Sequence, residues 1–462
     1  MRLIENFEKS GFFWLPSSPE KKVPGTLRIL DGGNTNLEIV GSFENHFDSL
    51  NTNINIGRIV GHIEGDKLVT LERCFYKTKS LSFGGIAKSS IRANKALIGV
   101  SYDDEEEVLI NQFQFSVDGI DEWVGISGIK VDRQFESKTS SISYLPPENI
   151  SITLNDGLRL VITFTWTLPG FPVTTEAKIT QKAYFGLVSD EARPLDDFIS
   201  AAYKITNLVG FSVDKTVCLE SVTVAANSLP IGNFDGKPVL AKIALFYASL
   251  PYTKERPQIA RHEMLFNFLQ IRGDWERIIN NWFSAYDLID PALNLYFSTK
   301  TGVHKYLDSK FLALAQGLET YHRRTSNEKQ MDEKAFESIK ELLTEKCPEE
   351  YQEWLSGRLR HGNEINLRKR LKRIIEPFND VIGSRDHQKR LISSIVNTRN
   401  YLTHYDQSLE AESSTGIDLW NLCKKMEAIF QLHILQVLGF SPDQIKAIHD
   451  NSTELQQKLK IT

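Results

Sequence analysis

The stretch SITLNDGLRLVITFTW, residues 151–166, decides the fold of the first half of the chain. Apolar and polar residues alternate on both sides of Asn155-Asp156-Gly157, and a period of two is typical of strands that bury one face. Glycine readily adopts positive φ, so this tripeptide favours a tight turn between the two runs. The stretch therefore predicts an antiparallel β-hairpin.

Similar alternating segments, rich in Val, Ile, Thr and Phe, recur from about Gly25 to Ala248. They are VPGTLRIL, NLEIVGSF, GRIVGHIEGDKLVTLERCFY and QFQFSVDG, with further strands expected at TVCLESVTVAA and KPVLAKIALFYA. One segment, residues 193–211, instead repeats its apolar residues at spacings of three and four, which predicts a helix. A mainly antiparallel β domain with one helix follows from these patterns.

The apolar period changes to a helical one after roughly Pro257. The helical segments are DWERIINNWFSAYDLI, DSKFLALAQGLETYHRR, DEKAFESIKELLTEK, EEYQEWLSGRL, NLRKRLKRIIEPF, HQKRLISSIVNTRNYL and GIDLWNLCKKMEAIFQLHILQVL. Because 462 residues exceed the usual size of one core, we expect two domains of an α+β protein. They are a β-rich domain over residues 1–260 and an all-α bundle over residues 261–462.

The composition, with 41% hydrophobic and 24% charged residues, is that of an ordinary folded protein. The N-terminal segment MRLIENFEKS lacks the apolar core of a signal peptide, and no uncharged run approaches membrane-spanning length. A cytoplasmic protein without membrane contact is therefore expected. The four cysteines lie far apart with no C-x-x-C pair, and the histidines show no metal spacing, so no metal or cofactor is predicted.

Positive charge is concentrated in one segment of an acidic chain. The net charge of −5 argues against a protein that coats nucleic acid over its whole surface. Between Ser356 and Asn400, however, 11 lysines and arginines stand against 4 acidic residues. This local excess of cations predicts an anion-binding surface on the helical domain.

The stretch SSIVNTRNYLTHYD, residues 393–406, overlaps the end of this basic segment and places a cation on an apolar stripe. In a helix, Arg399 lies seven residues beyond Ile392 and four beyond Ile395, and thus on the same face. Because Arg cannot lose its proton, burying it without a partner is costly. The face is therefore a site where an anion arrives, a subunit interface with carboxylates, or a helix end open to water.

His404 lies five residues after Arg399, which is about 140° around a helix and ~7.5 Å along it. One straight helix would not aim both side chains at one phosphate. Either the helix ends near Thr403 and turns His404 back, or each site is assembled from two copies of the helix. Asn400 is four residues before His404 and adjacent to it, so its amide can hold the imidazole or the phosphate.

Arginine with histidine is a competent pair for cutting RNA. The ribose 2′-OH is tethered beside the scissile phosphate, so the reaction needs a proton acceptor and donor near neutrality and a cation for the developing charge. Imidazole titrates near neutrality, and guanidinium binds phosphate oxygens in a fork. DNA lacks the nucleophile.

Several alternatives stay open on the residues alone. Arg399 and His404 are also compatible with a salt-bridged arginine and a solvated histidine. Arg256 and His262, six residues apart, show a similar spacing by chance. One rival is a non-catalytic protein whose helical domain oligomerises and whose β domain binds a ligand. A second is a metal-dependent nuclease or other hydrolase in the β half. No phosphate loop, G-x-S-x-G elbow or H-E-x-x-H motif is present.

The segment RNYLTH, from Arg399 to His404, resembles the R-N-x-x-x-H signature of HEPN ribonuclease domains. The N-terminal GFFWLPSSPEKKVPGTLRI, with LEIVGSF and DGIDEWVGI, resembles the β-rich domain of ApeA-type bacterial anti-phage proteins, which carry an HEPN domain at their C-terminus. KFLALAQGLETYHRR is similar to the helix that precedes the motif helix in those domains, with Glu319 as a recurring acidic position.

The resemblance implies a metal-independent endoribonuclease effector of abortive infection, which is dimeric or higher and has composite sites at the HEPN–HEPN contact. Arg399 and His404 match the catalytic positions, Asn400 the polar position after Arg, and Glu319 the acidic one. The products would carry a 2′,3′-cyclic phosphate, with tRNA as a possible target and a phage-derived trigger. Candidates for RNA contact are the cations Arg323, Arg324, Arg368, Lys369, Arg370, Lys372 and Arg373, with Tyr401 and Tyr405 for base stacking.

Overall fold

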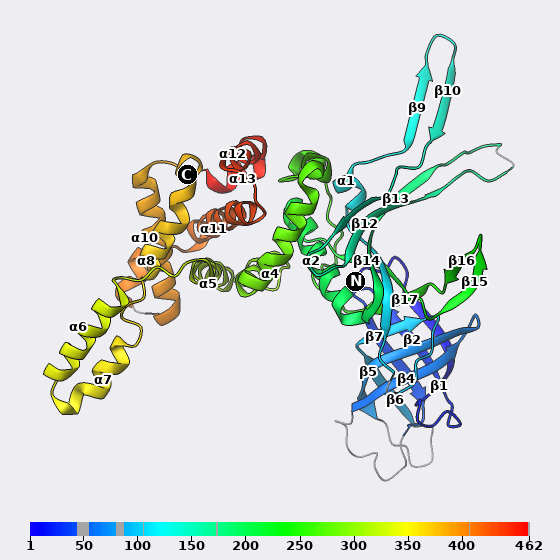
Figure 1. The fold of residues 1–462 in the computed structure, drawn as a ribbon, viewed down its shortest axis with the longest axis horizontal. Helices are drawn as coiled ribbons and strands as arrows, with labels where there is room; N and C mark the ends of the chain where they lie inside the picture. The colour runs from blue at the N-terminus through cyan, green and yellow to red at the C-terminus, as the bar shows by residue number, and fades with distance from the viewer. Residues whose placement is uncertain (44–54, 80–86, 105, 172–173, 406, 461–462) are drawn as a thin grey trace. The chain divides into compact units, whose positions relative to one another are not determined.

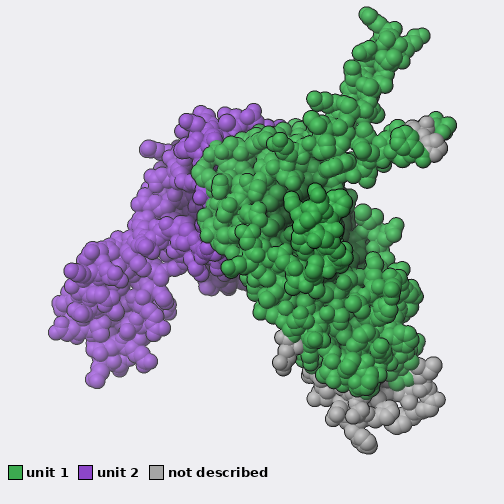
Figure 2. All heavy atoms as spheres, turned by 45° about the vertical axis from the view of Figure 1, so that its right-hand side comes forward, with its two compact units in different colours: residues 1–280 green, residues 281–462 purple. Residues whose placement is uncertain are grey.

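The computed structural model describes residues 1–43, 55–79, 87–104, 106–171, 174–405 and 407–460. The chain forms two compact units, residues 1–280 and 281–462, coloured green and purple in Figure 2. The first unit consists mainly of antiparallel strands and the second of helices (Figure 1). The α+β two-domain fold class predicted from the sequence is confirmed.

Unit 1 is built on one antiparallel sheet, which has 13 strands among the described residues. Six of them close into a barrel, because β5 pairs with β4 on one side and with β6 on the other. The barrel strands are β1 (Phe7–Trp14), β2 (Val23–Leu30), β3 (Asn34–Val40), β4 (Asn55–Ile63), β5 (Lys67–Lys79) and β6 (Lys88–Ala93). Alternate residues such as Leu27, Ile29, Leu37 and Ile91 fill its interior.

The rest of the sheet continues from β5 through β7 in the order β7-β17-β14-β8-β13-β12-β11. These strands are β7 (Lys95–Ile98), β8 (Leu109–Val117), β11 (Ile150–Thr153), β12 (Arg159–Thr167), β13 (Thr180–Pro194), β14 (Leu219–Ala225) and β17 (Ile243–Tyr247). β11 and β12 pair antiparallel with Thr153 opposite Arg159, so the hairpin predicted for residues 151–166 is confirmed. Two further hairpins pair outside the sheet, β9 (Ile129–Gln134) with β10 (Thr139–Tyr144) and β15 (Pro230–Phe234) with β16 (Lys237–Leu240).

Helices in unit 1 cover part of the sheet. The predicted helix of residues 193–211 is confirmed as α2 (Leu195–Ser212), whose Phe198 ring stacks 6.2 Å from Phe113 of β8. A short helix, α1 (Ile120–Val124), carries Trp123 with no exposed surface.

Unit 1 extends to residue 280, later than the boundary after residue 260 expected from the sequence. The elements here are η2 (Arg261–Glu263), α3 (Phe268–Ile271), η3 (Arg272–Asp274) and the start of α4 (Trp275–Ser298). The rings of Phe268 and Trp275 lie 6.1 and 5.8 Å from that of Trp123, so aromatic packing holds this helical segment against the β domain.

Unit 2 is a helical bundle, in which the predicted helical segments all appear. Its helices are the end of α4, α5 (Leu307–Thr325), α6 (Glu333–Lys346), α7 (Glu349–Leu359), α8 (Leu367–Ile375), η4 (Glu376–Phe378), α9 (Asn379–Ile382), α10 (Arg385–His404), η5 (Gln407–Glu412), α11 (Gly416–Val437), α12 (Pro442–Asn451) and α13 (Thr453–Leu459). α5 and α11 pack closely at Gly317, where an added Cβ would lie 2.9 Å from the Phe430 ring. Among the helices that the structure describes, none combines the length and apolar character needed to cross a bilayer.

Candidate active site on helix α10

Helix α10 (Arg385–His404) is unbroken through its last residue. Tyr405 then adopts the left-handed conformation, with φ of 51°, and its N–H donates to the Tyr401 carbonyl at 2.6 Å. These features end the helix at His404, one residue after Thr403. His404 itself keeps a helical position, so the helix end does not turn it back toward Arg399.

The side of α10 that faces the bundle core is apolar with one polar member. Its buried residues are His387, Leu391, Ile392, Ile395, Thr398 and Leu402. Thr398 has no exposed surface, and its hydroxyl accepts a hydrogen bond from the Ser414 N–H at 2.9 Å. Arg399 is one residue further round the helix and only partly buried. It therefore lies at the edge of the core face, beside the half-buried Val396, and not at its centre.

The Arg399 guanidinium is not neutralised within the described part of the chain. Its Nη1 donates to the Asn400 Oδ1 at 3.4 Å, and no carboxylate among the described residues lies within ion-pair distance of it. A cation at the rim of a bundle keeps its full charge under these conditions. The Asn400 amide is thus the side chain of the described residues that accepts a hydrogen bond from Arg399.

His404 points away from the core. It lies nine residues after the buried Ile395, about 180° around the helix, and it is exposed. Asn397 lies seven residues before His404 on the same side and donates to Glu412 of η5 at 2.8 Å. Arg399 and His404 of one chain therefore lie on different sides of α10, and the structure does not bring them together around one phosphate.

Tyr401 and Tyr405 pack against each other at the end of α10. Their ring centroids lie 5.7 Å apart in an edge-on arrangement, and Tyr405 is 65% exposed. The pKa of the Tyr401 hydroxyl is raised, mainly by desolvation and then by the negative charge of Glu410. The exposed ring of Tyr405 leaves base stacking as a prediction for this position.

Glu319 of α5 belongs to a different cluster. Its Oε1 accepts from Arg323 at 3.1 Å, and Arg323 also pairs with Glu364. Among the described residues no hydrogen bond or ion pair joins Glu319 to Arg399 or His404. The structure therefore places the Glu319 carboxylate in an ion-pair cluster with Arg323, and its role at the α10 site stays a prediction.

Comparison with known families agrees with this architecture. The family model ApeA N-terminal domain 1 matches residues 8–282, and the model Apea-like HEPN matches residues 312–444. The first match alone covers more than half of the chain. The chain belongs to the ApeA family. The resemblance seen in the sequence is thereby confirmed, and the helical unit contains an HEPN domain of an anti-phage nuclease family. No curated protein and no solved structure matches the chain.

The basic residues of the HEPN domain divide into paired and unpaired cations. Lys369 and Arg373 of α8 both pair with Glu328, at 3.2 and 2.9 Å, and these contacts lower the Glu328 pKa to about 2. Arg323 is paired as described above. Arg368 donates only to the Ser393 hydroxyl, at 2.8 Å. Arg324 and Lys372 are exposed and have no carboxylate partner in the described ranges.

Arg370 does not lie on the solvated face that the basic run NLRKRLKR was expected to form. It is 4% exposed, and its Nη1 lies 3.3 Å from His322 Nδ1. Desolvation, followed by repulsion from Arg323, lowers the Arg370 pKa, and desolvation also lowers the pKa of His322. The helical spacing of the sequence does indicate this burial. Arg370 is four residues before the buried Ile374 and therefore lies on the apolar side of α8.

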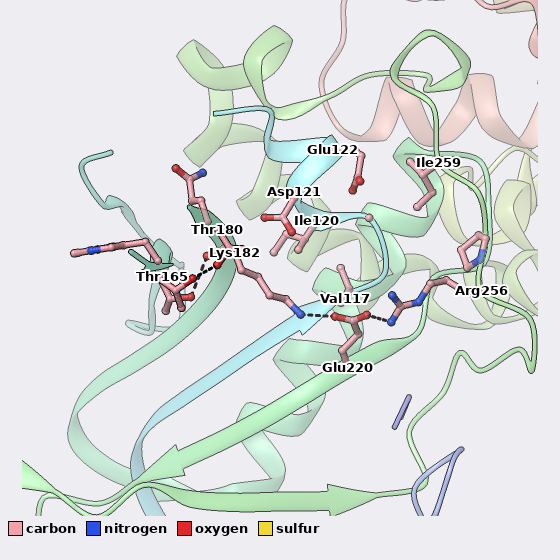
Figure 3. A pocket seen from close by; sticks show the side chains of 15 residues that line it. Val117, Ile120, Asp121, Glu122, Thr165, Thr180, Lys182, Glu220, Arg256 and Ile259 are labelled. Atoms are coloured by element: carbon pink, nitrogen blue, oxygen red, sulfur yellow. Dashed lines mark hydrogen bonds and ion pairs between the residues drawn. The ribbon is translucent and has the colours of Figure 1, made fainter. Parts of the chain in front are cut away.

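The β half contains a cavity of about 530 Å³ between α1, the β12–β13 ends and residues 256–259 (Figure 3). The half-exposed Trp166 lines it, whereas Trp123 is core. Lys182 and Arg256 point from opposite sides to Glu220, and each forms an ion pair with its carboxylate. Its lining residues include no His, Cys or Ser, and no group of three metal-binding side chains occurs among the described residues.

Proposed function

We propose that the chain is a metal-independent endoribonuclease of anti-phage defence, with its active site on α10. The observation that carries the proposal is the Arg399 guanidinium, which is unneutralised at the rim of an Apea-like HEPN bundle and followed by Asn400 and His404. A permanent cation kept without a carboxylate is a site for a phosphate. The motif helix thus supplies both a phosphate ligand and an imidazole, the side chain that most often transfers protons in catalysis.

In the proposed reaction the ribose 2′-oxygen attacks the adjacent phosphorus and the 5′-oxygen leaves, which yields a 2′,3′-cyclic phosphate. One imidazole takes the proton of the 2′-OH, and a second gives a proton to the leaving oxygen. Arg399 stabilises the charge that develops on the phosphate oxygens, and Asn400 positions Arg399. Because Arg399 and His404 diverge on one helix, a site is completed by the α10 of a second copy.

Outside the reacting phosphate, RNA would contact the cations that have no carboxylate partner among the described residues. These are Arg324, Arg368 and Lys372, with the paired but exposed side chains Arg323, Lys369 and Arg373 as secondary contacts. Arg370 is left out because its guanidinium is buried. Such contacts supply salt-dependent affinity without reading sequence, which suits an effector that acts on abundant RNA such as tRNA once a phage-derived signal is present.

The test is an RNA cleavage assay in EDTA with the purified chain. We expect His404→Ala and Arg399→Ala to lower the cleavage rate by roughly 10²- to 10⁴-fold without changing the far-UV circular dichroism. His361→Ala is a matched control, because this histidine is 75% exposed and paired with Glu364. Unchanged cleavage in both α10 variants, or activity that chelation abolishes, would exclude the proposed site.

A further inference from the structure

The cavity of the β domain lies where one strand of the sheet ends before its neighbour (Figure 3). The ladder between β8 and β13 ends at the pair Phe115–Phe185, whereas β13 continues to Thr180 in its pairing with β12. The chain after β8 turns at Gly119, which has a φ of 74°, and enters α1. The cavity therefore opens at the end of β8, between β13 and residues 256–259, and α1 forms one of its walls.

Two cations on the floor of this cavity are held by carboxylates behind them. Glu220, whose side chain is 13% exposed, pairs with Lys182 at 2.8 Å and also with Arg256. Asp118, whose side chain is 1% exposed, pairs with Arg256 at 3.3 Å and with Arg2 at 3.0 Å. The two cations themselves are accessible, with 38% of the Lys182 side chain and 55% of the Arg256 side chain exposed. Buried carboxylates thus hold two accessible cations in fixed positions.

Both cations have more hydrogen-bond donors than these pairs use. A lysine ammonium group has three donors and an arginine guanidinium has five. Among the described residues, Lys182 donates to Glu220, and Arg256 uses its Nε toward Asp118 and its Nη2 toward Glu220. Because Arg2 offsets the charge of Asp118, the two cations and Glu220 leave the floor with one positive charge. The floor therefore suits a group with a single negative charge, such as a carboxylate.

The wall formed by α1 carries the opposite charge. Asp121 and Glu122 line the cavity, and no cation of the described residues forms an ion pair with either. The Asp121 Oδ1 accepts a hydrogen bond from the Ala183 N–H at 2.6 Å, which fixes this carboxylate beside β13. Desolvation raises the pKa of Asp121, and the charges of Lys182 and Glu220 also act on it. The acidic wall and the basic floor thus lie within electrostatic reach of each other.

Apolar side chains complete the cavity. Its lining includes Ile120, Pro257, Ile259 and Trp166. An added Cβ at Gly119 would lie 2.1 Å from the Ile259 side chain, so the absence of a side chain at Gly119 lets Ile259 approach α1 this closely. A volume of about 530 Å³ is that of a small-molecule site. The cavity therefore offers one small ligand a basic floor, an acidic wall and an apolar surface.

We propose that this cavity binds a small zwitterion with an apolar side chain, namely a free amino acid or a short peptide. Lys182 and Arg256 bind its carboxylate. Asp121 and Glu122 bind its ammonium group. A phosphate compound fits less well, because the lining has three carboxylates and two cations, and a phosphate brings further negative charge. A ligand with only positive charge would leave the donors of Lys182 and Arg256 without an acceptor.

Calorimetric titration of the full-length chain with L-leucine at neutral pH tests the proposal. We expect a dissociation constant of about 1 mM or lower, because several charge-assisted hydrogen bonds form at once. L-Leucinamide lacks the carboxylate and 4-methylpentanoate lacks the ammonium group, so each should bind at least about tenfold more weakly. Glycyl-L-leucine separates the two sources of the ligand: tighter binding than that of L-leucine indicates a short peptide, and weaker binding indicates a free amino acid.

Two substitutions test the two charged surfaces of the cavity separately. Lys182→Met and Asp121→Asn should each weaken the binding of L-leucine by about tenfold or more. Asparagine can still accept the hydrogen bond from Ala183, so the second variant preserves the wall. Lys130→Met and Asp132→Asn are the matched controls, because both residues are exposed on β9 and do not line the cavity. Circular dichroism checks that each variant keeps its fold.

The proposal is overturned if neither L-leucine nor glycyl-L-leucine binds. Equal binding of L-leucine, L-leucinamide and 4-methylpentanoate would also overturn it, as would L-leucine binding that neither cavity variant weakens. Tighter binding of adenosine 5′-monophosphate than of L-leucine would assign the cavity to a phosphate ligand instead. The titrations contain no RNA, so their outcome is independent of the proposed function.

Discussion

Replacing Glu427 by glutamine should destabilise the helical unit more than any surface substitution. Glu427 of α11 is 1% exposed and pairs with Lys300 at 3.1 Å and Lys310 at 2.6 Å. Desolvation by burial opposes its ionisation, but the two lysines outweigh it and hold the Glu427 pKa below its usual value. The carboxylate is therefore charged in the folded chain and offsets two cations.

The size of the effect follows from what Glu427→Gln leaves behind. Removing one partner of a buried ion pair costs about 3–5 kcal/mol, because the remaining charge stays without compensation. The lysines here are 17% and 22% exposed, so partial hydration places the expected loss near the lower limit, at about 3 kcal/mol. For a unit of this size that loss lowers the melting temperature by roughly 6–12 °C.

Scanning calorimetry of the full chain, which resolves the transition of the helical unit, provides the measurement. Glu337→Gln is the control, since Glu337 makes an exposed pair with Lys340 at 3.0 Å and should change stability by less than about 0.5 kcal/mol. The direction of the pH dependence also follows from the lowered pKa of Glu427. The charged carboxylate stabilises the fold at pH values above the pKa of glutamate in the unfolded chain, and this contribution is lost as the pH falls through the lowered pKa of the folded chain. A melting temperature within two degrees of the wild type would refute the buried-pair reasoning.

Three further outcomes are expected. Arg399→Lys should retain the fold but lose at least about tenfold in RNA cleavage, because lysine cannot form the fork, whereas Arg324→Lys should be nearly neutral; equal rates would contradict this role. Burial lowers the His433 pKa to about 4. The folded chain should therefore lose on the order of 3 kcal/mol of stability as the pH falls from 6.5 to 4, because the unfolded chain takes up the proton first. In urea titrations, His433→Gln should make this pH dependence weaker. Thr398→Val should cost about 1 kcal/mol by leaving the Ser414 N–H without its acceptor, and a melting temperature unchanged by this substitution would argue against that hydrogen bond as a stabilising contact.

Periodicity was sufficient for the fold class and for most elements. The turn at Asn155-Asp156-Gly157 and the helix α10 depend on local chemistry, namely positive φ and an apolar stripe, which the sequence carries in full. The end of unit 1 could not be predicted in this way, because Phe268 and Trp275 belong to a segment with the pattern of the helical region. They join the β domain only through the ring of Trp123, a contact between residues far apart in the chain.

The residues proposed for the site could be chosen from the sequence, but their arrangement could not. The spacing of Arg399 and His404 was enough to predict that they lie on different sides of the helix. It also predicted that Arg399 lies on the core face, but the residue that the structure buries there is the smaller Thr398. Glu319 matched a family position, but its carboxylate is engaged by Arg323, and no sequence pattern reports which of several cations a carboxylate will choose. Arg370 is different, because its position four residues before the buried Ile374 already indicates the apolar side of α8, whereas its partners His322 and Glu364 come from other segments.

These placements separate two kinds of cation in the HEPN domain by what surrounds them. Arg323 and Arg370 both pair with Glu364, and Arg373 pairs with Glu328, so carboxylates of the segment between α5 and α8 already balance these cations. Arg399 differs from them, because it lies on the rim of the bundle and the Asn400 amide is its side-chain hydrogen-bond partner among the described residues. Under the proposed function this difference is expected, because a phosphate of RNA would supply the anion that the described part of the chain does not offer to Arg399.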